Sequence, residues 1–165
     1  MDKISPHTIN DIIVPIIRSG GQTGADRAAL NWAISNGLQH CGWCPRGRRA
    51  EDGRISKQYD LTETSSFGYV VRTKKNVEDS DGTVLFSISP ELSGGTLLTY
   101  EWAEKINKPS LLLYKDVVEP GCELRRFLSH YRIKDLNVAG PRKSTEPTIE
   151  DYVQQVLDEC FRLNG

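Results

Sequence analysis

The sequence has no apolar run approaching the roughly 20 residues that a membrane-spanning helix requires. It also has no strong excess of either charge, because 22 acidic residues face 21 basic ones and the net charge is -1. A strongly basic surface for nucleic acid or membrane is therefore not the default expectation. The polar first residues, MDKISPHTIN, lack the pattern of a signal or transit peptide, so we expect a cytoplasmic protein.

Cysteine and histidine are scarce, with four and three copies. Four cysteines without a secretion signal favour reduced thiols over a disulfide framework. Cys41 and Cys44 form a lone C-x-x-C motif, but a structural zinc site needs a second ligand pair, and His7 and His130 are isolated. Pro45 follows directly and favours a loop over the helix that opens at a redox-active C-x-x-C. We expect no structural metal.

Short apolar runs alternate with helical periodicity along the rest of the chain. This alternation predicts an α/β fold: a single Rossmann-like three-layer domain over residues 1–165, with a mostly parallel sheet. Strands are expected from Ile16 and over residues 68–73, 82–89, 109–115 and 136–140. Helices are expected over 25–33, 94–107 and 149–160, with a short helix or turn at 74–81. A short strand or turn is expected at 40–45, a loop at 46–66 and a mixed stretch at 116–144.

The segment SGGQTGAD ends the first of these strands and opens a helix. Gly20, Gly21 and Gly24 permit positive φ and close approach of a ligand, and a helix amino terminus attracts anions such as phosphate. Gln22, Thr23 and Arg27 complete the loop, and Asp26 could cap the helix or reach a sugar hydroxyl. Since no Lys-Ser/Thr pair follows and the glycine spacing differs from G-x-G-x-x-G, the loop is neither a P-loop nor a dinucleotide motif. A tight turn with glycines for packing alone is the alternative.

A second glycine loop follows the strand at 82–89 and reads SPELSGGT. Ser93, Gly94, Gly95 and Thr96 would place small residues and hydroxyl groups at a helix amino terminus. Two such loops at the carboxyl ends of parallel strands should flank the crevice in which open α/β sheets bind ligands. A simple helix cap at Ser93 or Thr96 is the alternative.

The segment GWCPRGRRAEDG carries clustered arginines. Arg46 and Arg48 could bind phosphate through bidentate guanidinium contacts, Cys44 could touch the ligand, and Trp43 could stack on a planar heterocycle. A solvated charged loop is the alternative.

A polar stretch before the strand at 82–89 contains Arg72, Asn76, Asp79 and Asp81. These carboxylates could cap backbone groups, coordinate a cation or bind ribose hydroxyls. A polar turn with local hydrogen bonds explains the same residues equally well.

The blocks SGGQTGADRAALNWAI, GWCPRGRRAEDGRI and NVEDSDGTVLF together resemble the molybdenum carrier family, the circularly permuted YpsA-like branch of the SLOG Rossmann-like superfamily. The resemblance covers residues from about Ile16 to Leu113. It implies a domain that binds molybdenum cofactor, which is a phosphorylated pterin dithiolene, or a nucleotide-derived ligand. The ligand positions that it implies are Gly20, Gly21, Thr23, Gly24, Asp26, Arg27, Cys44, Arg46, Arg48, Arg72, Asn76, Asp79, Asp81, Gly94, Gly95 and Thr96.

Two other functions stay open. The segment SGGTLLTYE resembles the P-G-G-x-G-T-x-x-E loop of LONELY GUY phosphoribohydrolases, with Glu101 at the offset of the acidic residue, although the third glycine and the threonine after it are missing. This resemblance implies cleavage of nucleoside 5′-monophosphates, with Glu101 as a general acid or base. The third candidate is an oligomeric interaction module whose ligand regulates assembly, and a homo-oligomer is expected.

Overall fold

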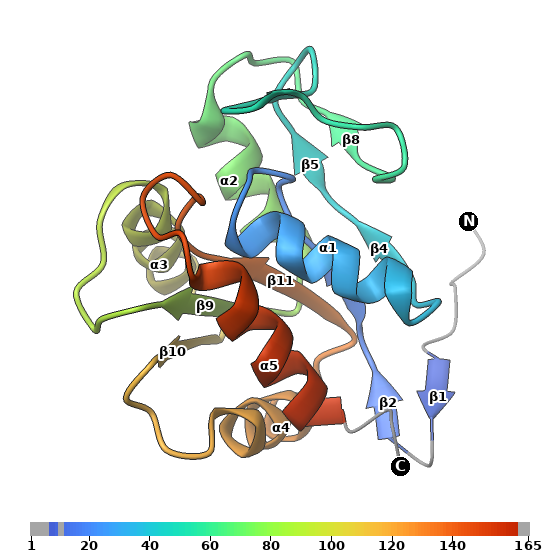
Figure 1. Cartoon of the computed structure of the whole chain (residues 1–165), viewed down its shortest axis with the longest axis vertical. Coiled ribbons are helices and arrows are strands. Elements are labelled where there is room, and N and C mark those ends of the chain that lie inside the picture. Colours follow the sequence, from blue (N-terminus) through green and yellow to red (C-terminus); the bar gives the residue numbers. More distant parts are fainter. Residues whose placement is uncertain (1–6, 10–11, 162–165) are drawn as a thin grey trace.

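The computed structural model describes residues 7–9 and 12–161 and is built on one parallel sheet (Figure 1). Its five strands run in the order β10-β9-β11-β3-β4, and every neighbouring pair is parallel. Their bounds are β3 (Ile16–Arg18), β4 (His40–Cys41), β9 (Gly82–Ser87), β10 (Ser110–Tyr114) and β11 (Asp135–Ala139). The predicted α/β, Rossmann-like fold is confirmed.

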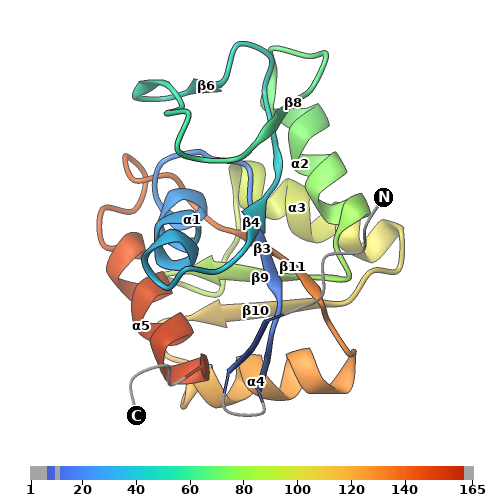
Figure 2. The same ribbon diagram turned by 90° about the vertical axis from the view of Figure 1, so that its right-hand side faces the viewer.

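Helices cover both faces of this sheet and make three layers (Figure 2). One face carries α1 (Ala25–Ser35), α4 (Pro120–His130) and α5 (Ile149–Phe161), and α5 packs against both of the others. The other face carries α2 (Tyr69–Asp79) and α3 (Gly94–Lys105). This division of the helices between the two faces is the one that right-handed crossovers between parallel strands produce. Among the described residues, no helix is both long and apolar enough to cross a membrane.

The centre of the sheet explains why a nearly continuous apolar run forms a strand here. All six residues of β9 are buried, since helices lie above and below it. Val84 and Phe86 join the main core, in which the ring of Phe86 meets the ring of Tyr152 edge-on at 5.8 Å. Tyr152 belongs to the buried face of α5, within the helix predicted over residues 149–160.

Two helical segments were not predicted as helices. Residues 68–73 were expected to form a strand, but they begin α2, in which burial follows a helical spacing at Thr73 and Val77 while Val70 faces solvent. The mixed stretch at 116–144 contains α4, which buries Leu124 and Phe127. Pro120 stands at its first helical position, where proline needs no amide partner.

A small cap lies over the carboxyl edge of the sheet, and residues 42–68 form it (Figure 1). It contains β5 (Trp43–Cys44) paired with β8 (Thr62–Glu63), and a hairpin of β6 (Arg49–Ala50) with β7 (Gly53–Arg54). Its apolar centre packs on Leu30 of α1 and consists of Cys44, Ala50, Ile55, Tyr59 and Leu61. A second hairpin, of β1 (His7–Ile9) and β2 (Ile12–Val14), precedes the sheet. The expected loop at 46–66 is thus a folded unit with short strands.

Candidate functional site

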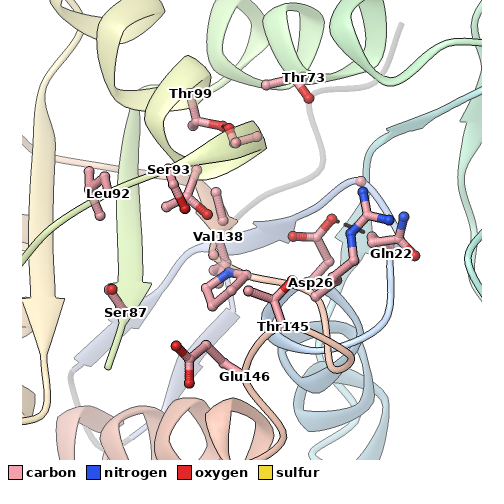
Figure 3. Close-up of a pocket in the computed structure, with 18 of the residues that line it drawn as sticks. Gln22, Asp26, Thr73, Ser87, Leu92, Ser93, Thr99, Val138, Thr145 and Glu146 are labelled. Atoms are coloured by element: carbon pink, nitrogen blue, oxygen red, sulfur yellow. Dashed lines mark hydrogen bonds between the residues drawn. The ribbon is translucent and has the colours of Figure 1, made fainter. Parts of the chain in front are cut away.

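A pocket of about 190 Å³ lies at the carboxyl ends of β3, β9 and β11 (Figure 3). The chain leaves β3 for α1 on one face of the sheet and leaves β9 for α3 on the other, with β11 between them. Open α/β sheets bind ligands where the connections diverge in this way. The topology alone therefore singles out this position.

The structure gathers part of the predicted site in this pocket and leaves part outside. The predicted residues that line it come from both glycine loops and from α2: Gly20, Gln22, Asp26, Arg72, Asn76, Ser93, Gly94, Gly95 and Thr96. The predicted residues that do not line it are Gly21, Thr23, Gly24, Arg27, Trp43, Cys44, Arg46, Arg48, Asp79, Asp81 and Glu101.

Backbone N–H groups of the first glycine loop are already hydrogen-bonded within the protein. Four of its backbone N–H groups donate to protein acceptors: Gln22 to the Asp26 carboxylate, Thr23 to Gln22 Oε1, Ala25 to the Pro141 carbonyl and Arg27 to the Gln22 carbonyl. Gly24 has a φ of +82°, and a Cβ atom there would lie only 2.7 Å from the Lys143 nitrogen. This loop therefore packs tightly against the segment after β11, and these four donors are unavailable to an anion.

Asp26 and Arg72 form a buried ion pair on one wall of the pocket, with Arg72 Nη1 2.9 Å from Asp26 Oδ2. Their side chains are 7% and 13% exposed. Burial raises the pKa of Asp26, and the Arg72 guanidinium opposes that rise. Gly20 lies beneath the pair, and a Cβ atom there would overlap the guanidinium, so the Arg72 side chain would have to shift.

The amino terminus of α3 forms the opposite wall and is open. Ser93 is extended and makes no side-chain capping bond, so the alternative of a simple cap through the Ser93 hydroxyl is not formed. A Cβ atom at Gly94 or Gly95 would meet nothing within 4 Å. Thr96 and Thr99 are buried beside them and line the pocket. A helix amino terminus with free space before it is suited to a negatively charged group.

The third wall is the segment between β11 and α5, which the sequence analysis did not assign to the site. Arg142, Thr145 and Glu146 from this segment line the pocket, beside Asn137 of β11. The sequence did contain a signal for this wall. The strand predicted at 136–140 ends in Gly-Pro, and polar residues follow it, as polar residues also follow the strands before the two glycine loops. The same rule about strand ends would have found it.

Arg48 requires a correction, because it lies away from the pocket and inside the cap. Its φ is +55° and its side chain turns inward, leaving the residue 8% exposed. The guanidinium donates to four backbone carbonyls: Ile55 at 3.0 Å, Leu61 at 3.2 Å, Ser56 at 2.8 Å and Tyr59 at 2.8 Å. Arg48 is a structural residue of the cap. Arg46 is exposed, with its guanidinium carbon 5.0 Å from the centre of the Phe67 ring.

The remaining polar candidates also hold the structure together. Trp43 Nε1 donates to Asp79 at 2.7 Å, and the Trp43 backbone pairs with the side chain of Asn76. The Asp81 carboxylate accepts the backbone N–H groups of Lys134 and Asp135 at 2.9 Å, which caps the start of β11. Glu101 is an exposed residue of α3.

The C-x-x-C motif is divided between β4 and β5, and both thiols are free. Burial raises the pKa of Cys41 to about 11 and also raises the pKa of Cys44. Neither thiol is therefore an activated nucleophile at neutral pH. Across residues 7–9 and 12–161, no three His, Cys, Asp or Glu side chains gather as a metal site requires.

The fold and pocket define a Rossmann-like α/β domain with a polar pocket at its topological switch point. The chain belongs to the circularly permuted YpsA family of the SLOG group, which it matches over residues 17–161. This match extends beyond the region from Ile16 to Leu113 that carries the resemblance in the sequence. A crystal structure of a proposed molybdenum carrier protein from Syntrophus aciditrophicus SB is 40% identical, with a TM-score of 0.87. The alignment covers 90% of this chain and 95% of that one. Among proteins with curated functions, none matches.

Proposed function

We propose that this chain binds a small phosphorylated ligand in the pocket and acts as a carrier of a phosphorylated pterin such as molybdenum cofactor, or of a nucleotide-derived compound. The observation that carries the proposal is the open amino terminus of α3 at Gly94 and Gly95, which faces a polar pocket at the switch point. The helix dipole and the first-turn N–H groups would hold the phosphate there. The resemblance to a protein described as a molybdenum carrier supports the choice of ligand.

Of the two glycine loops that the sequence offers for a phosphate, the proposal uses the second. The first glycine loop has committed four amides to the protein, whereas the second has free space in front of its helix. Asp26 and Glu146 line the pocket and offer carboxylate oxygens to hydroxyl or ring N–H donors of a sugar or pterin. The pocket is smaller than the roughly 300 Å³ at which drug-sized ligand pockets begin, so part of such a ligand would extend toward the cap.

The ligand can be identified by native mass spectrometry of freshly purified protein, which should show a phosphorylated pterin or nucleotide. The phosphate position is tested with Gly95→Asp, which places a carboxylate in the first turn of α3 and should abolish binding of the identified compound. Val70→Asp is the matched control, because it adds the same charge at the same position of the first turn of α2, outside the pocket lining. Equal affinity of both variants and the wild type would contradict the assignment.

The alternative of a phosphoribohydrolase depends on Glu101, which is exposed on α3 and does not line the pocket. The carrier proposal expects no release of free base from nucleoside 5′-monophosphates. If the wild type released free base and Glu101→Ala did not, the phosphoribohydrolase function would be favoured instead.

The proposal includes a cytoplasmic location and a homo-oligomer. Light scattering during size-exclusion chromatography, with and without the co-purified ligand, would measure the oligomeric state. A ligand-dependent change of mass would favour the third candidate, the interaction module.

A further inference from the structure

We propose that the pocket contains a second anionic subsite, at Arg142 and Arg72, so that the ligand carries two phosphoryl-sized anionic groups. This inference rests on the proposed function, in which the first group sits at the amino terminus of α3. It assigns the β11–α5 segment, which neither the sequence motifs nor the comparisons connect with a ligand.

The backbone around Arg142 is fixed from both sides. The Ala25 N–H donates to the Pro141 carbonyl at 3.2 Å, and the Lys143 N–H donates to Thr23 Oγ1, also at 3.2 Å. The missing side chain of Gly24 lets this segment lie directly on the first glycine loop. Arg142 thus enters the pocket wall from a held backbone, and the first loop supports it.

Glu51 ties the cap to the same segment. Its carboxylate accepts the Ser144 hydroxyl at 2.5 Å, the Ser144 N–H at 3.2 Å and the hydroxyl of Thr23. Its own N–H donates to Gln22 Oε1 at 2.9 Å. Three segments far apart in the sequence therefore meet at one carboxylate and set the position of the Arg142 segment.

Both guanidinium groups keep capacity for an anion. The distance from Arg142 Nη1 to Glu51 Oε2 is 3.7 Å, which is longer than a charge-assisted hydrogen bond, and the Arg142 side chain is 41% exposed. Arg72 uses Nη1 for Asp26, and its buried Nε has no partner within the described part of the chain. The guanidinium carbons of Arg72 and Arg142 each lie 5.5 Å from the centre of the Tyr69 ring, which Arg49 also approaches to 5.3 Å, so the two pocket arginines lie beside the same aromatic side chain.

The two subsites lie on different walls of the pocket. Figure 3 shows Ser93 and Thr99 of α3 on one side and Asp26, bonded to Arg72, on the other. Glu91 and Glu146 also line the pocket, and as carboxylates they disfavour a third negative group and favour hydroxyl or N–H donors. The charges predict a ligand with anionic groups at its two ends and hydrogen-bond donors elsewhere.

The test is a titration of the ¹⁵N-labelled protein with inorganic phosphate, followed by NMR. Two sets of signals are expected to saturate with separate curves: the backbone amides of residues 94–96 and the side-chain Nε–H of Arg142. Arg142→Gln should weaken the second phosphate by about tenfold or more and leave the first unchanged. Gly95→Asp should remove the first and retain the second. Arg126→Gln, an exposed arginine outside this pocket, is the control and should retain both.

A single phosphate per chain, lost in Gly95→Asp and unaffected by Arg142→Gln, would overturn the second subsite and leave the proposed function intact. Absence of any phosphate binding would overturn both. Because the Arg142 side chain is partly exposed, Arg142→Gln should fold normally, and a urea titration of the variant checks this.

Discussion

Replacement of Arg48 by methionine separates a structural role of this arginine from a role in ligand binding. Methionine keeps an unbranched stem in the cap but removes all of the guanidinium donors. The four backbone carbonyls of Ile55, Ser56, Tyr59 and Leu61 then lose their bonds to Arg48. At about 1 kcal/mol net for each hydrogen bond, the loss is ~4 kcal/mol, which is within the range for breaking a buried charged contact.

The free energy of unfolding is measured by urea titration, with limited proteolysis of residues 42–68 to detect local opening of the cap. Arg46→Met is the matched control, since Arg46 lies two positions away, is exposed and contacts only the face of Phe67 among the aromatic rings of the described chain. It should lose at most about 1 kcal/mol. If Arg48→Met were as stable as Arg46→Met, the structural role would be refuted, and a role in binding would again be the better explanation.

Three further predictions concern the pocket walls and the C-x-x-C motif. Gly24→Ala should lower the free energy of unfolding, measured by urea titration, by about 2–4 kcal/mol, because φ is +82° and the new Cβ meets the backbone of the β11–α5 segment. Gly37→Ala is the control, since Gly37 is also at positive φ but in open space, and it should lose only about 1–2 kcal/mol. Hydrogen bonds from the hydroxyl groups of Ser144 and Thr23 lower the pKa of Glu51 below its usual 4.5, so its carboxylate stabilises the fold above that pH and loses this effect as the pH falls through the lower value. The stability difference between wild type and Glu51→Gln should narrow on acidification below pH 4.5, and a constant difference would contradict this. With a pKa of about 11, only about one part in a thousand of Cys41 is thiolate at pH 8, and the thiolate is the form that reacts. Alkylation of Cys41 by iodoacetamide, followed by mass spectrometry, should therefore be at least ~100-fold slower in the folded protein than in urea.

The sequence predicts well those strands and helices whose own residues carry a clear apolar pattern. Residues 82–89 are apolar throughout the middle and bounded by Gly82 and Pro90, and β9 forms within them. The strand predicted for GYVVRT was wrong. Two adjacent valines favour a strand, but packing against α3 stabilises a helix there. In α2 the buried positions are Thr73, Asn76 and Val77, and two of these three are polar. The sequence of this helix therefore has no apolar stripe from which it could have been predicted.

The arginine loop shows a second limit of sequence reasoning. Arg46 and Arg48 are two residues apart and chemically identical, yet one is exposed and the other is bonded to four carbonyls. The difference arises from the backbone at Arg48, whose positive φ turns the side chain into the cap. Its acceptors lie 7 to 13 residues further along a segment that reads as loop. A local pattern cannot indicate that this segment closes around a charge.

The glycine loops show which part of a ligand site can be inferred from sequence. Glycine is required where the backbone approaches another group closely, but that group can be a ligand or the protein itself. At Gly20 and Gly24 the space that a Cβ would take is already filled, by Arg72 and by the segment after β11, whereas at Gly94 and Gly95 it is empty. The filling groups lie about 50 and 120 positions away in the sequence, so no reading of SGGQTGAD could have found them. The first loop therefore acts on the pocket indirectly, through the two arginines that it places, and the second loop is the one whose glycines can face a phosphate.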